Sequence, residues 1–418
     1  MTRQACLACA QETSELDPAT RCRACGGLLD VWHPEPPVTG QALRTLFDSR
    51  MSPLSSPASP SSGVWRFREL VLPGAAAGVV SYPEGNTPLL ARESLSIWTG
   101  VPALALKHEG ENPTGSFKDR GMTVGLTQAR RIGARAVVCA STGNTSASLA
   151  AYGAQAGLPV FVLIPEGKVA LGKLAQTLAY GARVLAVRGD FDTCLGLVED
   201  SAERLGLYLL NSVNPFRIEG QKTIIFELLQ QRAWRAPDWI VLPGGNLGNT
   251  AAFGKALQEA LALGLCDRLS RLAVVQAAGA APFAQSFAEG FRHRYELRAE
   301  TVATAIRIGN PASWERAVRA IRATNGVVLS VPDEEILAAK SVVDRAGVGC
   351  EPASAAGVAG LRRLVGSGTV SPEESVVVIL TGHLLKDPEI VLEDAKVGTA
   401  GIREIDPTLA ALKAAVEG

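Results

Sequence analysis

Residues 136–164 read AVVCASTGNTSASLAAYGAQAGLPVFVLI, which is one complete strand–helix–strand unit. Two apolar runs, 136–140 and 160–164, flank a segment over 145–156 that has the length and the small apolar residues of a packed helix. Strands that are apolar throughout, rather than alternating with polar residues, are typical of a parallel sheet covered by helices on both faces. The unit therefore predicts an α/β fold with parallel sheets.

The same alternation extends in both directions from this unit. We predict further strands at 103–107, 184–187, 239–242, 272–276 and 376–380. The other helix-length segments are 116–132, 170–180, 191–205, 219–232, 249–263, 313–323, 333–345 and 353–365. Because the consecutive units between 116 and 210 are enough for a sheet of their own, we expect two lobes, with a smaller α/β lobe inserted at about 116–212. Such folds bind ligands at the carboxyl ends of the strands.

Composition and charge restrict the class of protein. The 418 residues are 47% hydrophobic and 20% charged, which is typical of a folded protein of enzyme size. Because 41 Lys and Arg balance 41 Asp and Glu, no net field attracts nucleic acid or an anionic membrane. No apolar run is long enough to span a bilayer, and the first residues, MTRQACLACAQE, lack the apolar core of a signal peptide. We expect a cytoplasmic protein with a small-molecule partner, and neither nucleic acid nor a membrane.

Four of the eight cysteines, Cys6, Cys9, Cys22 and Cys25, form two CxxC pairs near the start of the chain. Two such pairs separated by a short loop can hold Zn²⁺ tetrahedrally. Disulfides fit poorly with the absence of a secretory signal, and a redox CxxC would follow a strand in a larger α/β unit. We predict a four-cysteine zinc ribbon over residues 1–33. The other four cysteines are scattered, and we expect them to be buried as small hydrophobic residues.

A change of composition separates this ribbon from the rest of the chain. Residues 51–63 read MSPLSSPASPSSG and lack the apolar content for a core. We predict a Pro/Ser-rich linker over 34–63 and a catalytic body over 64–418.

The segment NPTGSFKDRG over 112–121 places Lys118 in the first turn of a predicted helix. The helix dipole disfavours a cation there, which eases loss of the proton and makes the amine a better nucleophile. A solvated surface lysine is the alternative.

Two further turns join an apolar strand to a helix. The turn at 140–146, ASTGNTS, offers hydroxyls, Asn144 and helix-start N–H groups that can hold an anion. The turn at 242–250, LPGGNLGNT, has the free N–H groups of a phosphate cradle. A plain helix cap and a turn that binds nothing are the alternatives. Because neither the dinucleotide nor the Walker order matches, we expect the phosphate of a small cofactor rather than of NAD or ATP.

The last predicted strand is followed by TGHLLKDP at 381–388. Thr381 offers a neutral hydroxyl at the expected cleft, whereas a lone histidine such as His383 is more often structural than catalytic. A reactive lysine, a phosphate cradle and this hydroxyl together indicate a pyridoxal phosphate site.

The chain resembles the threonine synthases, a family of fold type II pyridoxal-phosphate enzymes with the tryptophan-synthase-β-like fold. NPTGSFKDRG carries the resemblance, which runs from GVWRFRE at 63–69 to Pro388. Many bacterial members also have an N-terminal cysteine ribbon. The resemblance implies a lyase of threonine biosynthesis that converts O-phospho-L-homoserine and water to L-threonine and phosphate. We also expect a homodimer.

The resemblance assigns roles to particular residues. Lys118 would link to pyridoxal 5'-phosphate and shuttle protons, Asn144 would bond the ring oxygen, and Thr381 would bond the ring nitrogen. The residues that would bind the cofactor's phosphate are Gly245, Asn246, Leu247, Gly248 and Asn249. The segment NSVNPFR at 211–217 resembles the family's NSVNP-x-R pattern. The residues that would hold the substrate are Ser141, Thr142, Thr145, Lys173, Asn211, Ser212 and Arg217.

Two residues depart from the family pattern. Leu247 stands where Ala or Ile is usual, and Leu384 replaces a Gly, so bulk at these places would reshape the pocket. Alternatives within the same fold are a cysteate synthase, a cysteine synthase or a threonine ammonia-lyase. A zinc-ribbon binding protein that has lost catalysis is a further alternative. The ribbon's three arginines against four carboxylates, a net charge of −1, and the intact motif around Lys118 argue against it.

Overall fold

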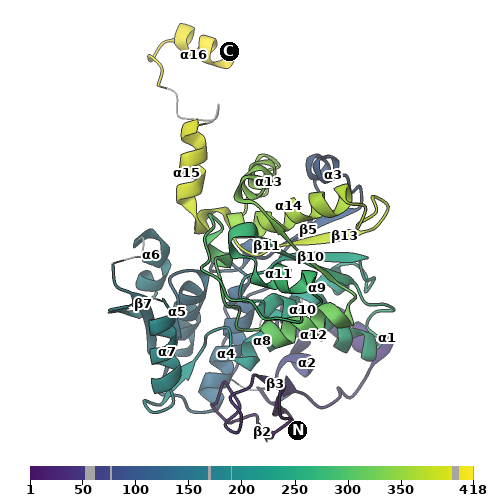
Figure 1. Ribbon diagram of the computed structural model, residues 1–418, viewed down its shortest axis with the longest axis vertical. Helices are drawn as coiled ribbons and strands as arrows, with labels where there is room; N and C mark the ends of the chain where they lie inside the picture. Colours follow the sequence, from purple (N-terminus) through teal and green to yellow (C-terminus); the bar gives the residue numbers. More distant parts are fainter. Residues whose placement is uncertain (52–61, 76–77, 168–170, 190, 398–403, 418) are drawn as a thin grey trace. The chain divides into compact units, whose positions relative to one another are not determined.

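The computed structural model describes residues 1–51, 62–75, 78–167, 171–189, 191–397 and 404–417 (Figure 1). Of the predicted linker over 34–63, residues 52–61 therefore lie outside the described residues. The chain divides into two compact units, Met1–Lys386 and Asp387–Gly418. Each unit is described by itself.

The large lobe of the first unit is built on a six-stranded sheet. Its strand order is β12 (Val327–Val331), β11 (Arg271–Ala277), β10 (Trp239–Pro243), β13 (Val376–Leu380), β5 (Leu104–His108) and β4 (Leu89–Leu90). Every neighbouring pair is parallel except β4 and β5. Parallel pairing brings the carboxyl ends of these strands to one edge, where the expected ligand site lies.

The small lobe carries a separate parallel sheet. Its strand order is β8 (Arg183–Val187), β7 (Val160–Pro165), β6 (Ala136–Ala140) and β9 (Leu207–Leu209). The strands of this sheet lie within the segment, at about 116–212, that was expected to form a smaller lobe.

Alternate residues of the central strands enter different core clusters. In β10, Ile240 and Leu242 belong to one cluster, and Trp239 and Val241 to another. The helices on the first side of the large sheet include α9 (Thr223–Gln231), α10 (Gly248–Ala262) and α12 (Trp314–Ala323). Those on the second side include α3 (Glu93–Thr99), α13 (Asp333–Arg345) and α14 (Pro352–Gly366).

The small sheet is covered in the same way. Val137 and Cys139 of β6 face one cluster, and Val138 and Ala140 face another. The helices that contribute to these clusters are α4 (Lys118–Arg131), α5 (Asn144–Ala156), α6 (Leu171–Ala179) and α7 (Phe191–Ser201). The prediction of parallel sheets covered on both faces is thus confirmed for both lobes.

The predicted elements recur with small shifts at their ends. The main difference is the predicted helix 219–232, which is two helices, α8 (Pro215–Gln221) and α9. Asn214 caps α8 by accepting a hydrogen bond from the Phe216 N–H at 3.0 Å, and Pro215 occupies its first turn. Further α-helices of the first unit are α1 (Gly40–Ser49), α2 (Arg68–Val71) and α11 (Pro282–Ala288).

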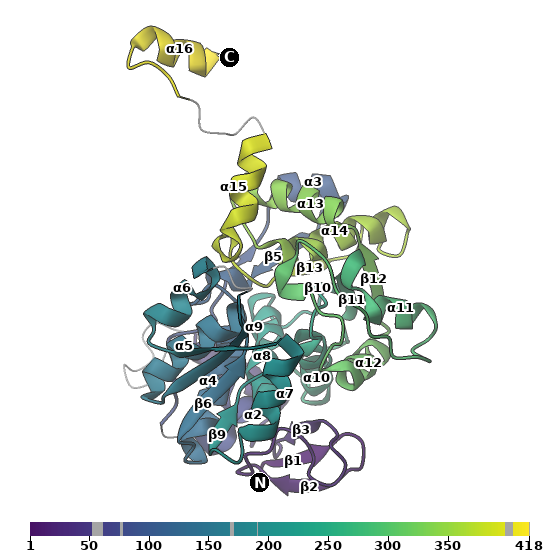
Figure 2. The same ribbon diagram turned by 60° about the vertical axis from the view of Figure 1, so that its left-hand side comes forward.

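The first residues form a small antiparallel sheet in the order β2 (Glu12–Ser14), β1 (Arg3–Cys6) and β3 (Leu29–Trp32). We call residues 1–33 the ribbon. Figure 2 shows it, in purple, near α7 and β9 of the small lobe. Glu15 pairs with Arg131 at the end of α4 (2.9 Å), and Asp30 pairs with Lys255 of α10 (2.9 Å). The ribbon is therefore tied to both lobes.

Helix α12 of the large lobe also holds the ribbon. Arg316 donates to the Leu29 carbonyl, and Arg319 donates to the Leu7 carbonyl at 2.7 Å. The ribbon docks on the body through charged side chains that bond its backbone.

The second unit contains α15 (Pro388–Val397) and α16 (Leu409–Glu417). Among the described residues, no helix combines the length and the apolar character that a membrane crossing requires.

Candidate active site

Lys118 is held at the start of α4 by backbone contacts to the loop after β13. Ser116 forms an isolated bridge with Gly382, and the Phe117 N–H donates to the Thr381 carbonyl at 3.0 Å. The Lys118 Nζ lies 3.8 Å from the centre of the Phe117 ring. Burial, followed by the positive charge of Arg217, lowers the pKa of Lys118 to about 7, while Glu351 opposes this shift. Much of the amine is therefore neutral, and nucleophilic, at neutral pH.

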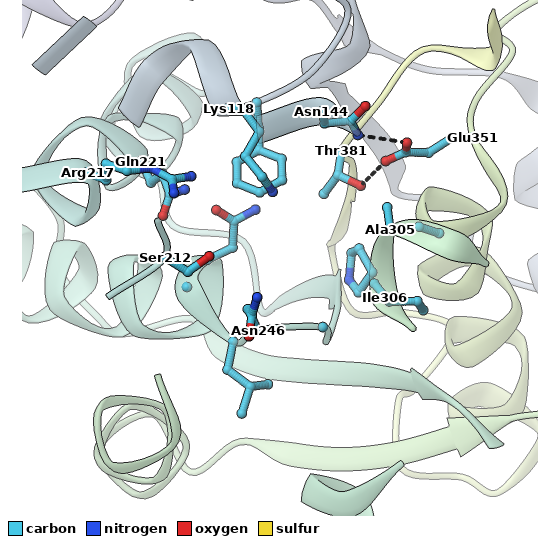
Figure 3. Close-up of a pocket in the computed structure, with 17 residues that line it drawn as sticks. Lys118, Asn144, Ser212, Arg217, Gln221, Asn246, Ala305, Ile306, Glu351 and Thr381 are labelled. Atoms are coloured by element: carbon cyan, nitrogen blue, oxygen red, sulfur yellow. Dashed lines mark hydrogen bonds between the residues drawn. The ribbon is translucent and has the colours of Figure 1, made fainter. Parts of the chain in front are cut away.

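Asn144 and Thr381 meet at the carboxylate of Glu351. Asn144 Nδ2 donates to Glu351 Oε2 at 2.9 Å, and Thr381 Oγ1 donates to Glu351 Oε1 at 3.3 Å. Ser354 Oγ also lies within hydrogen-bond distance of Thr381 Oγ1, at 3.0 Å. Figure 3 shows Asn144, Glu351 and Thr381 on one wall of the pocket that Lys118 enters.

The glycine-rich turn after β10 forms the floor of this pocket. Gly245, Asn246, Leu247, Gly248 and Asn249 all line it. Leu247 has a left-handed backbone (φ 62°) and immediately precedes α10, so the turn reverses tightly and the helix begins at the pocket.

Several features of the turn leave its backbone accessible to a bound group. A Cβ on Gly245 would lie 3.1 Å from the Ile306 Cα, so a larger side chain would crowd the pocket. The buried Asn249 Oδ1 has no hydrogen-bond partner among the described residues, and rotation of the amide would present its N–H₂ instead. The turn thus has the backbone and the free amide that a phosphate cradle needs.

Arg217 enters the pocket from α8. Its side chain is 1% exposed, and Nη1 donates to the Leu210 carbonyl at 3.1 Å. Nε and Nη2 have no hydrogen-bond partner among the described residues. Burial lowers the pKa of Arg217 to about 10, so the group stays cationic at neutral pH. Ser212 and Gln221 line the pocket beside it (Figure 3).

Close packing of α4 on α8 brings Lys118 and Arg217 into one pocket. A Cβ on Gly220 would lie 1.8 Å from the Arg120 carbonyl oxygen, and a Cβ on Gly121 would lie 3.1 Å from the Arg217 carbonyl oxygen. Only glycine permits this approach of the two helices.

Other residues expected at the site lie outside this lining. Ser141, Thr142 and Thr145 belong to the turn that precedes and begins α5, beside Asn144, and do not line the pocket. Both amide atoms of Asn211 bond the backbone of Ala140 at 2.9 Å, which ties β6 to the 211–217 segment. Lys173 belongs to α6, but its side chain lies outside the described residues.

The two residues that depart from the family pattern, Leu247 and Leu384, lie in different parts of the fold. Leu247 is 2% exposed and joins the core of the large lobe, while it also lines the pocket. Leu384 packs on Gly349, where a Cβ would lie 2.4 Å from the Leu384 Cδ2, and it does not line the pocket.

The four ribbon cysteines come together. Their Sγ atoms lie within 4.8 Å of one another. Although burial opposes ionisation, hydrogen bonds from the backbone at Cys9 and Ala8 lower the pKa of Cys6 to about 6. The scattered cysteines, Cys139, Cys194, Cys266 and Cys350, are buried, as predicted.

Comparison with known proteins agrees with this site. A family model described as pyridoxal-phosphate dependent enzyme matches residues 80–382. The threonine synthase of Methanosarcina acetivorans is 46% identical over 415 residues, which cover 99% of this chain and 98% of the relative. The chain belongs to the threonine synthase family. A second threonine synthase, from Mycobacterium tuberculosis, is 51% identical over 317 residues, 75% of this chain and 86% of the relative.

Solved structures show the fold of this threonine synthase family member. Threonine synthase from Escherichia coli has a TM-score of 0.69 at 19% identity, covering 98% of this chain and 94% of that one. Threonine deaminase isoform 2 from Solanum lycopersicum has a TM-score of 0.64 at 21% identity, covering 86% and 95%. The expected fold class, the dependence on pyridoxal phosphate and the threonine synthase family are thus confirmed.

Two lining residues, Glu351 and Gln221, were not singled out by their sequence pattern. Glu351 directly precedes Pro352 at a helix start, which reads as an ordinary helix boundary. Gln221 ends α8, four residues after Arg217 and therefore on the same helical face. That spacing is a signal that sequence reasoning could have used.

Proposed function

We propose that this chain converts O-phospho-L-homoserine and water to L-threonine and phosphate, with pyridoxal 5'-phosphate as cofactor. The observation that carries the proposal is that one pocket offers two separate positions for a phosphate. The turn 245–249 is one, and the free donors of Arg217 beside Ser212 are the other. A cofactor phosphate and a substrate phosphate need two such positions.

The pocket suits the cofactor. Lys118 would be linked to it, Asn144 would bond its ring oxygen, Thr381 would bond its ring nitrogen, and residues 245–249 would hold its phosphate. When bound, pyridoxal phosphate supplies an electron sink for the negative charge that develops at the substrate's α-carbon.

The substrate phosphate is assigned to Arg217 and Ser212. A buried guanidinium with unused donors has lost its hydrogen bonds to water and has not gained others in the protein. A bound dianion would supply the missing hydrogen bonds. Gln221 adds an amide on the same side of the pocket. Thr145 and Lys173 remain proposed contacts. Asn211 would act by fixing the segment that carries Ser212 and Arg217, because its own amide bonds Ala140.

Lys118 is the proposed base. Its Nζ, neutral in part near pH 7, takes the proton from the substrate's α-carbon and returns a proton later in the cycle. Arg217 holds the γ-phosphate in place and stabilises the charge on the departing phosphate. Because Lys118 and Arg217 carry like charges when both are protonated, binding of the dianion between them also favours the protonated form of Lys118.

The decisive experiment is a steady-state assay of the purified protein with O-phosphohomoserine, in which threonine and phosphate are measured together. We expect the two products in equal amounts. Phosphate without threonine, or turnover of O-acetylserine or threonine with none of O-phosphohomoserine, would instead favour the β-replacement or deamination alternatives.

We also propose that the ribbon binds one Zn²⁺ through Cys6, Cys9, Cys22 and Cys25. The proximity of the four Sγ atoms supports thiolate ligation. Elemental analysis is expected to give one zinc per chain, and a chelator is expected to expose all four thiols to alkylation. A metal-free protein with all four thiols open to alkylation would refute the zinc site.

The organisation of the protein beyond the site is likewise proposed. We propose a ribbon over 1–33, a linker over 34–63, which includes α1, and a catalytic body over 64–418. We further propose a cytoplasmic homodimer. Analytical ultracentrifugation of the purified protein tests the dimer.

A further inference from the structure

Glu351 is a buried carboxylate inside the pocket. It is 1% exposed and lines the same pocket as Lys118. It stands directly before α14, where a carboxylate could satisfy the free N–H groups of the helix, yet its side chain makes no capping hydrogen bond. Helix capping therefore does not account for this residue.

The carboxylate of Glu351 joins the two lobes across the pocket. Asn144 begins α5 of the small lobe and donates to one oxygen, and Thr381 follows β13 of the large lobe and donates to the other (Figure 3). Gly382 makes room for this arrangement, because a Cβ there would lie 2.5 Å from the Glu351 carboxyl carbon. One anion thus fixes the orientation of two side chains from different sheets.

The same carboxylate acts on Lys118 through its charge. Among the described residues, Arg217 of α8 and Glu351 are the charged groups that shift the titration of Lys118. Burial and Arg217 lower the pKa of the amine, and Glu351 opposes both. Without Glu351, a protonated Lys118 would face Arg217 with no compensating charge.

We propose that Glu351 is a positioning residue that orients Asn144 and Thr381 toward the cofactor ring and places a negative charge in the pocket that Lys118 enters. This inference rests on the cofactor roles proposed for these three residues. It does not depend on the identity of the substrate.

Three variants separate the charge of Glu351 from its position. Glu351→Gln removes the charge and keeps the shape, and Glu351→Asp keeps the charge but withdraws the carboxylate by one methylene. Glu335→Gln is the matched control, because Glu335 is a paired carboxylate on α13 (2.6 Å from Arg363) and does not line the pocket. Each protein is stripped of cofactor. The visible absorbance of bound pyridoxal phosphate is then followed from about pH 5.5 to about pH 9 as the cofactor is added back.

In wild type, the rate of absorbance growth is expected to rise with pH through a midpoint near 7, as Lys118 loses its proton. In Glu351→Gln the midpoint falls by roughly one pH unit, since a nearby opposite charge shifts a pKa by about 1–3 units. Glu351→Asp keeps the wild-type midpoint but binds the cofactor several-fold more weakly. Glu335→Gln is expected to have the wild-type midpoint and the wild-type cofactor affinity.

An unchanged midpoint in Glu351→Gln overturns the proposal. If that variant does not fold, as judged by circular dichroism, wild-type cofactor affinity in Glu351→Asp overturns it instead. These measurements use no substrate, so they stay separate from a failure to turn over O-phosphohomoserine.

Discussion

Two arginines on neighbouring helices, Arg120 of α4 and Arg217 of α8, are both buried but have opposite surroundings. Arg120 donates to Glu109 at 2.6 and 2.8 Å and to Glu227 at 2.8 Å. Although burial opposes it, these carboxylates raise the pKa of Arg120. Arg217 has one backbone carbonyl as partner, and burial lowers its pKa to about 10.

The difference separates a structural cation from one available to a ligand. Arg120 belongs to a network in which Lys107 (2.6 Å) and Arg66 (2.9 Å) also pair with Glu227, so its charge is compensated within the fold. Arg217 keeps unused donors that face a pocket, which is costly in a folded protein unless a bound anion completes the site. The predictions below test this separation.

Lys118→Ala is expected to have the largest effect. Turnover of O-phosphohomoserine should fall by about 10⁴-fold, the upper end of what a general base contributes, because both the cofactor link and the base are lost. The measurement is phosphate release. Borohydride reduction of wild type should also attach the cofactor to the peptide that contains Lys118, and attachment to another lysine would contradict the assignment.

Arg120→Met should act on stability. It leaves Glu109 and Glu227 buried with less compensating charge, so the free energy of unfolding should fall by about 3–5 kcal/mol in denaturant titrations. Arg363→Met is the control, because Arg363 forms an exposed pair with Glu335 and such pairs contribute about 0–1 kcal/mol. Equal losses in the free energy of unfolding of the two variants would show that the buried network contributes no more to stability than an exposed ion pair.

Arg217→Met should act on activity and spare the fold. A charge-assisted hydrogen bond contributes about 1.5–3 kcal/mol, so kcat/KM for O-phosphohomoserine should fall by roughly tens to hundreds of fold. The free energy of unfolding should not decrease, and the visible absorbance of the bound cofactor should persist. Wild-type kinetics in this variant would remove Arg217 from the substrate site.

The smallest effect concerns the pH dependence of stability without cofactor. The pKa of Lys118 is about 7 in the folded protein, against an ordinary value of 10.5. Between these values the unfolded chain binds more protons, so Lys118 makes the free energy of unfolding rise with pH over this window. The slope is limited by the single proton that Lys118 can release. A Lys118→Met protein should lack this component when unfolding is measured at about pH 7 and pH 9.

Features encoded within short segments could be predicted from the sequence. The apolar strands of both sheets and the turn 245–249 recur in the structure because each depends on local composition. β9, which has three residues, and β12 were missed, and the start of α8 was missed although Asn214-Pro215 is a cap signal. Whether such a segment forms a strand depends on the neighbouring strand with which it pairs rather than on the segment itself.

The parts of the site that depend on distant partners could not be predicted. Arg120 stands in the motif that carries the family resemblance, but its partner Glu227 lies 107 residues further along the chain. Glu351 meets Asn144 from 207 residues away. Neither partner is distinguishable from a surface carboxylate until the fold removes it from water.

The attachment of the ribbon has a consequence for the order of synthesis. Residues 1–33 leave the ribosome before α12, and their strand pairing joins residues at most 29 positions apart, so the ribbon sheet can close early. Their docking partners on α12, Arg316 and Arg319, lie 287 and 312 residues downstream of the carbonyls that they bind. During translation these two contacts can therefore form only after about three-quarters of the chain has been made, later than the contacts of the ribbon with Arg131 and Lys255.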